Sequence, residues 1–161
     1  MQKMTSASMI GGILLIAFTL AFIAVFSLES SRVQLGFDDG DNPEQSIDFL
    51  YEYSIVYEIS GTLQILISVT LVYSVLAVAQ IFRKPTFDPA VYSSTIFGLF
   101  AAGAYFLNGA LRLAAARPLL YIDSLNHEWG IIAYLVVQMV GIQGFAQAAI
   151  VNLGLWAIGL S

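Results

Sequence analysis

Few residues in this chain have side chains suited to catalysis or ligand binding. It contains one histidine, His127, and no cysteine. One histidine cannot supply both axial ligands of a bis-histidine haem, and thiolate chemistry needs cysteine. His127 is therefore only a weak candidate for a cofactor ligand, and its neighbours Asn126 and Glu128 favour a solvated or capping position at a helix start. We expect no catalytic residues and no metal site, and the sequence leaves any cofactor unknown.

Known chemical motifs are missing as well. The sequence has no phosphate-binding loop, no G-x-S-x-G and no G-x-G-x-x-G, and it has no basic patch for nucleic acid. The acidic run "DDGDNPE" resembles a calcium loop in composition, but it lacks the alternating ligand spacing of an EF-hand. This absence argues against most soluble enzyme classes and against nucleic-acid binding.

The hydrophobic composition indicates that the residues named above are carried by transmembrane helices. The chain is 58% hydrophobic and 11% charged, whereas a typical soluble domain has about 25% charged residues. Its charges leave four uncharged stretches, at residues 4–28, 59–82, 89–111 and 129–161. A helix of roughly 20 apolar residues crosses the hydrocarbon core. The sequence therefore predicts an integral membrane protein in which the lipid bilayer is the solvent for these segments.

The predicted fold is all-α, a single bundle of four transmembrane helices. Their spans are expected at about 8–28, 59–82, 89–112 and 128–152, with an acidic extramembrane segment at 29–58. A cleaved signal peptide is the alternative for the first span. That alternative is disfavoured because the apolar run is longer than a usual signal core.

Local signals predict where the helices begin and end. "NPEQ" at residues 42–45 starts the second helix well before its span, so this helix extends beyond the membrane, with Gly61 as a point where it can kink. Asp88 and Pro89 start the third helix, and Pro118 predicts its end near Ala116. The fourth helix has more apolar residues than one crossing needs. It must tilt, break near residues 152–154, or leave its last turns outside the bilayer.

Charge distribution predicts the orientation. Ten of the eleven acidic residues fall in the first and third loops, on one side of the membrane. The adjacent Arg83 and Lys84 in the short second loop, together with Lys3, favour cytoplasmic termini. The expected location is the cytoplasmic membrane of a bacterium or archaeon.

Two arginines follow the third apolar stretch. Arg112 comes 23 residues after Pro89, which places it near the membrane interface, and Arg117 lies in the headgroup region or beyond. Helical spacing puts Arg112 on one stripe with small residues suited to close helix packing, and puts Asn108 on nearly the same side; the stripe consists of Gly98, Ala102, Tyr105, Gly109 and Arg112. We expect Arg112 to pair with Glu58 or Glu128 and to tie the helix ends together. A contact with a lipid headgroup or an anionic substrate is the alternative.

The fourth helix carries Gln143 and Gln147 one turn apart, and a face with Gly141 and Gly144. Interhelical hydrogen bonds and close helix packing are the expected roles. A polar pathway or a cofactor contact is the alternative.

These features favour a non-catalytic accessory or scaffold subunit of a larger membrane complex, such as an energy-converting or pigment-binding assembly. The expected partners are lipid, other membrane subunits or further copies of the chain. A small transporter or channel is the first alternative, and a membrane-embedded enzyme or cofactor-binding protein is the second.

Overall fold

The computed structural model describes residues 43–82 and 88–159, together with residues 9, 10, 12, 13, 16, 17, 19–21, 23, 24 and 27. Those amino-terminal residues are helical. The other residues of the predicted span at 8–28, and residues 29–42 of the predicted acidic segment, lie outside the described part.

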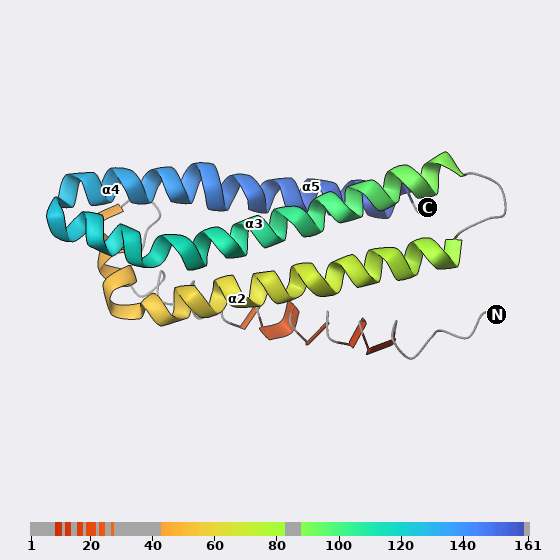
Figure 1. Ribbon diagram of the computed structural model, residues 1–161, viewed down its shortest axis with the longest axis horizontal. Helices are drawn as coiled ribbons and strands as arrows, with labels where there is room; N and C mark the ends of the chain where they lie inside the picture. Colours follow the sequence, from red (N-terminus) through yellow and green to blue (C-terminus); the bar gives the residue numbers. More distant parts are fainter. Residues whose placement is uncertain are drawn as a thin grey trace.

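Three helices within this part are long and apolar enough to cross a membrane, over Leu50–Phe82, Pro89–Leu125 and His127–Gly159. They run side by side along the long axis of the molecule (Figure 1). The described part of the chain is therefore helical, as predicted, and these three helices, which are apolar enough to span a membrane, include three of the four predicted spans.

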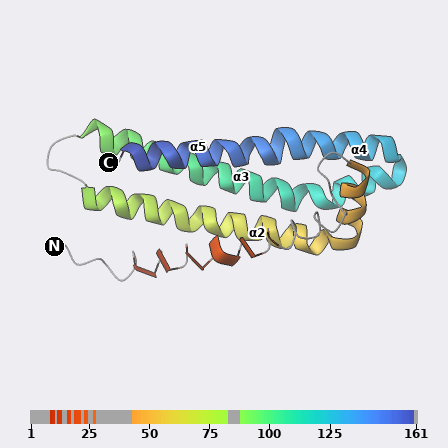
Figure 2. The same ribbon diagram turned by 180° about the vertical axis from the view of Figure 1, so that it is seen from behind.

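The first of these helices, α2, covers Pro43–Phe82, so it extends beyond its span as the sequence predicts. Its backbone leaves helical geometry at Tyr53 (φ −131°, ψ 33°). The turns before Tyr53 bend across the end of the bundle (Figure 2). Gly61, where the sequence allowed a kink, instead lies within α2 without a departure from helical geometry and contacts Gly109 of the next helix, α3 (Pro89–Leu125).

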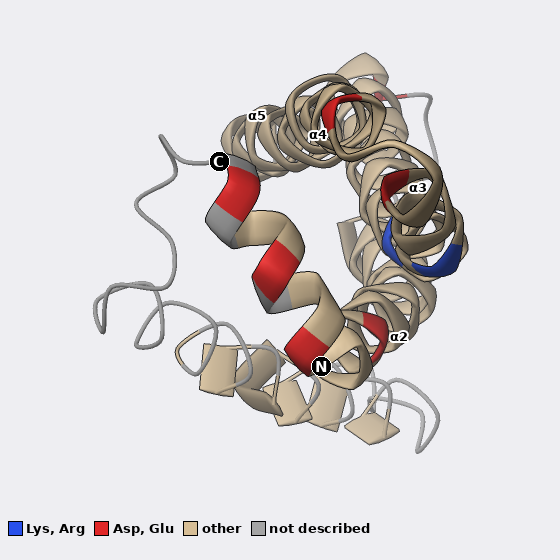
Figure 3. Ribbon diagram, turned by 90° about the vertical axis from the view of Figure 1, so that its left-hand side faces the viewer, with Lys and Arg blue, Asp and Glu red and all other residues tan. Residues whose placement is uncertain are grey.

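The segment of α2 before the kink is amphipathic. Ile47 and Leu50 are buried at 2% and 1% exposure, whereas Glu44, Asp48 and Glu52 are exposed. Figure 3 shows these acidic turns crossing the bundle end. Burial of the apolar side chains holds this segment, the end-cap segment (43–52), against the three long helices.

The second long helix, α3, covers Pro89–Leu125 and begins as predicted. The Asp88 carboxylate accepts a hydrogen bond from the Ala90 N–H at 3.1 Å. The predicted end near Ala116 is wrong, because the helix continues through Pro118 for another two turns. Leu119 is buried in these turns, and the Tyr51 hydroxyl donates to the Leu120 carbonyl at 3.1 Å. Packing against the end-cap segment thus maintains helix beyond the proline.

The third long helix consists of α4 (His127–Val136), the π-helical segment η2 (Val137–Gln143) and α5 (Gly144–Gly159). Asn126 caps its start, since its side-chain oxygen accepts from the Trp129 N–H at 3.1 Å. The helix passes residues 152–154 without a break. Its irregularity lies in η2, where the wider π turns change the register of the side chains.

Glycines allow the backbones of these helices to pack closely against one another. A Cβ atom on Gly61 would lie 2.8 Å from the Gly109 carbonyl oxygen, and one on Gly98 would lie 2.7 Å from Val75. A Cβ atom on Gly141 would lie 2.0 Å from a methyl carbon of Leu111. Missing side chains at these positions therefore allow α3 to pack closely on both α2 and η2.

Candidate functional site

Arg112 lies in the interior of the bundle, on the face of α3 turned toward α2. It is 8% exposed. Its Nη1 atom donates to the Ser60 hydroxyl at 3.1 Å, and its guanidinium carbon lies 5.2 Å from the centre of the Tyr57 ring. A hydrogen bond and a cation–π contact from α2 thus hold this charge near the end of the span.

The prediction that Arg112 forms an ion pair with Glu58 or Glu128 is wrong, because Arg112 contacts Ser60 and Tyr57. Glu58 lies beside Arg117 instead, with Oε1 3.8 Å from Nε. Glu128 is exposed in the first turn of α4. The Arg117 side chain is 88% exposed. This difference arises because Arg112 faces inward toward Ser60, whereas Arg117, five residues later, lies on the outer surface of α3.

Asn108, one turn before Arg112, links α3 to η2. It is 1% exposed, and its Nδ2 donates to the Ile142 carbonyl oxygen at 2.9 Å. Because π-helical turns disturb the usual i to i−4 pairing, a side-chain donor helps to satisfy a carbonyl in this segment. The bond therefore fixes α3 against the irregular part of the third long helix.

Each of the three long helices also carries a buried amide oxygen without a partner among the described residues. The side-chain oxygens of Gln64, Asn108 and Gln138 are buried and have no hydrogen-bond partner within the described part of the chain. Gln64 lies beside Gly109, since a Cβ atom there would be 3.0 Å from the Gln64 Cβ. A buried acceptor without a partner costs about 1–3 kcal/mol. These three oxygens, which we call the buried amide oxygens, can each accept a hydrogen bond from a hydroxyl or ammonium group.

The structure divides the residues that were predicted to pack helices together into two groups. Gly98, Ala102, Gly109 and Gly141 lie between helices. Gln143, Gly144 and Gln147 are exposed on the outer surface of the third long helix. Within the described part of the chain, these three residues do not pack one helix against another.

His127 is exposed at the start of α4, and its Nδ1 lies 2.8 Å from the Asp123 carboxylate of α3. This contact joins two consecutive helices at the surface. Over the residues that the structure describes, no group of three or more histidine, aspartate or glutamate side chains is placed to hold a metal ion.

Sequence reasoning missed Tyr57, Ser60 and Gln138. A signal was present for the first two, because Tyr57, Ser60 and Gln64 repeat at helical spacing along α2. Their shared face is polar, and Arg112 docks on it. Gln138, whose side-chain oxygen is buried, lies in the π-helical segment η2 and carried no comparable signal.

The arrangement therefore offers a buried arginine, the three buried amide oxygens and an exposed pair of glutamines. None of these groups forms a recognisable nucleophile–base or metal-binding constellation within the described residues. No known protein family, curated protein or solved structure shows significant similarity to this chain.

Proposed function

We propose that the chain is a non-catalytic scaffold or accessory subunit of a larger membrane assembly, and that it docks through the outer face of the third long helix. The observation that carries this proposal is the exposure of Gln143 and Gln147 within a membrane span. Each amide has two donors and an acceptor that hydrocarbon cannot satisfy.

The depth of these glutamines strengthens the argument. Gln143 lies 16 residues after His127, or about 24 Å along a helix that is about 50 Å long. Moving an amide without a partner from water into hydrocarbon costs about 4–8 kcal/mol. A neighbouring transmembrane helix that hydrogen-bonds to both glutamines removes this cost.

The third long helix is also the least covered of the three. Only 11% of its apolar window is buried, against 28% for each of the other two. Large aliphatic side chains flank the glutamines along the helix and are more than half exposed, namely Ile132, Val136, Val140, Ile150, Val151 and Ile158. This face suits a partner helix that is apolar at its ends and polar at its centre.

We further propose that both termini lie in the cytoplasm. The end-cap segment and its acidic side chains then lie on the opposite surface, at the end of the bundle seen in Figure 3. Arg83 and Lys84 in the short connection between α2 and α3 support this orientation, because basic residues in short loops are retained in the cytoplasm.

The buried amide oxygens favour a second candidate, a small transporter or channel with a polar pathway. Asn108 is hydrogen-bonded to the π-helical segment η2, and π-helical segments are frequent at functional sites in helices. Flux of small polar solutes or ions into vesicles containing the purified chain, lowered by Asn108→Leu, would favour this candidate over the scaffold role.

The scaffold proposal is tested by purification from native membranes in a mild detergent, followed by native mass measurement and identification of every subunit. We expect partners in fixed stoichiometry. The double variant Gln143→Leu/Gln147→Leu should lose them, whereas Leu107→Ala should keep them, because Leu107 is an exposed apolar residue on α3 next to Asn108. Recovery of the wild-type chain alone, without partners, would contradict the proposal.

Because the sequence contains no cysteine, single introduced cysteines can test for a partner on this face while the chain is still in the membrane. Single variants Gln147→Cys and Leu107→Cys can be treated with a bifunctional thiol reagent or a photoactivatable thiol label before extraction. We expect a discrete adduct of fixed mass from position 147 and none from position 107. Equal, diffuse labelling of lipid from both positions would contradict a partner on this face.

A further inference from the structure

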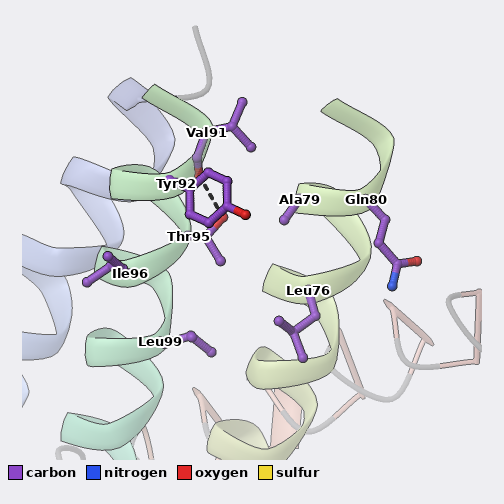
Figure 4. Close-up of a pocket in the computed structure, with 8 residues that line it drawn as sticks. All are labelled: Leu76, Ala79, Gln80, Val91, Tyr92, Thr95, Ile96 and Leu99. Carbon is purple, nitrogen blue, oxygen red and sulfur yellow. Dashed lines mark hydrogen bonds between the residues drawn. The ribbon is translucent and has the colours of Figure 1, made fainter. Parts of the chain in front are cut away.

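Gln147 is exposed within a membrane span, and its amide group carries two donors and an acceptor. It lies 12 residues before Gly159, the last residue of α5, which corresponds to about 18 Å of helix. Gln80, the amide beside the groove between α2 and α3, differs in depth (Figure 4). It lies two residues before the end of α2 at Phe82, so it can reach water at the membrane surface. Gln147 therefore requires a polar partner inside the membrane.

The exposed face of α5 around Gln147 has a regular pattern. Successive spacings of 3, 4, 3 and 4 residues place five exposed residues on one side of the helix, and they are Gly144, Gln147, Val151, Gly154 and Ile158. Val151 is 60% exposed and Ile158 is 71% exposed. The same alternation of 3 and 4 places the contact residues of two parallel helices that wind around each other. We call these five residues the α5 seam.

The two glycines of the α5 seam do not pack against another helix within the described part of the chain. A Cβ atom on Gly154 would meet no described atom within 4 Å, and one on Gly144 would meet only the carbonyl oxygen of Met139 in the same long helix, at 4.0 Å. By contrast, a Cβ atom on Gly141 would lie 2.0 Å from Leu111 of α3. The seam glycines thus leave the backbone of α5 open to close approach by a helix from outside the chain.

We propose that the α5 seam is the interface of a parallel homodimer in which the two Gln147 side chains hydrogen-bond to each other. This inference rests on the proposed docking face and names its occupant. The same basic residues orient every copy in the membrane, so the α5 helices of two copies run parallel. A two-fold axis along the membrane normal then sets each seam residue opposite its equivalent at the same depth. The oxygen of each amide accepts from the nitrogen of the other, so identical glutamines satisfy each other.

The rest of the seam fits the same partner. Gly144 and Gly154 flank Gln147, so in a symmetric pair a glycine of one copy meets a glycine of the other on both sides of the amide pair. The chain already contains such a contact, since Gly61 and Gly109 meet backbone to backbone between α2 and α3. A second copy also supplies, at the matching depth, the polar centre and apolar ends that the third long helix requires in a partner.

Disulfide cross-linking of the full-length chain in its membrane tests the seam, because the chain has no cysteine of its own. Val151→Cys and Ile158→Cys place a thiol on the seam. The matched controls, Ile150→Cys and Ala157→Cys, each lie one residue earlier and are also exposed, but they are turned by about 100° around the helix. Oxidation with copper phenanthroline should join the seam thiols into a species of twice the chain mass, since a disulfide needs Cα atoms within about 7 Å. The controls should stay monomeric.

Gln147→Leu tests the amide pair in the purified chain. In a dilution series followed by native mass measurement, this variant should lower the association constant of the dimer at least about threefold, equivalent to about 0.6 kcal/mol, the average for one interhelical hydrogen bond. Gly154→Leu should abolish the dimer, because its side chain separates the two backbones. Gly103→Leu on α3 is the matched control, since a Cβ there also meets no described atom within 4 Å, and it should leave the dimer unchanged. Thermal unfolding of each variant verifies that it is folded.

Equal dimer yields from the seam and control cysteines would reflect random collision and would overturn the proposal. A dimer that withstands both Gln147→Leu and Gly154→Leu would overturn it as well, because the interface would lie elsewhere. If the wild-type chain forms no dimer but a thiol at position 147 is cross-linked to a different protein, the second copy is wrong and the docking face is retained. If position 147 gives neither a dimer nor an adduct with another protein, the docking face fails too.

Discussion

Gly61 and Gly109 face each other across α2 and α3 with their backbones in contact. A Cβ atom on Gly109 would lie 2.5 Å from the Gly61 carbonyl oxygen, and one on Gly61 would lie 2.8 Å from the Gly109 carbonyl oxygen. Real Cβ atoms essentially never approach an atom below 3.0 Å. This crossing brings Arg112 within reach of Ser60, and it therefore determines where the buried charge lies.

Gly109→Ala should destabilise the bundle by about 1–3 kcal/mol, the usual cost of inserting a methyl group where the backbone must move to admit it. Gly103→Ala is the matched control on the same helix, because a Cβ there would meet no described atom within 4 Å. That control should be neutral or slightly stabilising, since alanine favours helix over glycine. Thermal unfolding in mild detergent measures both effects. Equal stability of the two variants would show that this crossing is not tight.

Arg112→Leu should lower stability by about 1.5–3 kcal/mol, because it removes a charge-assisted hydrogen bond to Ser60 and the contact with the Tyr57 ring. Arg117→Gln is the control, and its effect should stay below about 1 kcal/mol because its pair with Glu58 is exposed. Chemical unfolding of both variants gives the comparison. If Arg117→Gln lowered stability more than Arg112→Leu, Arg117 and not Arg112 would be the arginine that stabilises the bundle.

The contrast between Pro89 and Pro118 illustrates what the sequence could predict. Asp88 and Pro89 form a local signal with its own hydrogen bond, so the start of α3 was predictable. Pro118 is a local signal too, but the helix continues because Leu119 and Leu120 contact the end-cap segment. The end of α3 therefore depends on long-range packing, which the local sequence alone does not predict.

In the candidate site too, the sequence predicts the features that depend on one helix and does not predict those that depend on packing between helices. Helical spacing identified the stripe that carries Gly109 and Arg112, since that spacing depends only on α3. It could not identify Ser60 as the partner of Arg112, because the rotation of α2 against α3 depends on the Gly61 contact. The π turns of η2 also had no signal in the sequence, so the burial of Gln138 and the exposure of Gln143 could not be assigned beforehand.

Asn108→Leu should destabilise the chain by about 0.6–1.7 kcal/mol, from the average to the largest value measured for hydrogen bonds between transmembrane helices. The change removes the donor to the Ile142 carbonyl and leaves that oxygen in a dry environment. Asn152→Leu is the matched control, because its amide donates within its own helix to Ala148. Unfolding in detergent and amide hydrogen exchange at residues 137–143 measure the outcome. Faster exchange there in Asn152→Leu than in Asn108→Leu would contradict the role of this bond.

Leu50→Ala should detach the end-cap segment from the bundle. Leu50 is 1% exposed and belongs to a cluster with Tyr57 and Leu119, so truncation should cost about 2–5 kcal/mol. The lost contacts hold the turns before the kink at Tyr53, so cleavage by an added protease should increase within residues 43–52. Ile55→Ala, at a position that is 61% exposed just beyond the kink, should leave both stability and cleavage unchanged. If both variants were cleaved at the wild-type rate, the end-cap segment would be held by its acidic surface or by its connection to the preceding chain, and Leu50 would not anchor it.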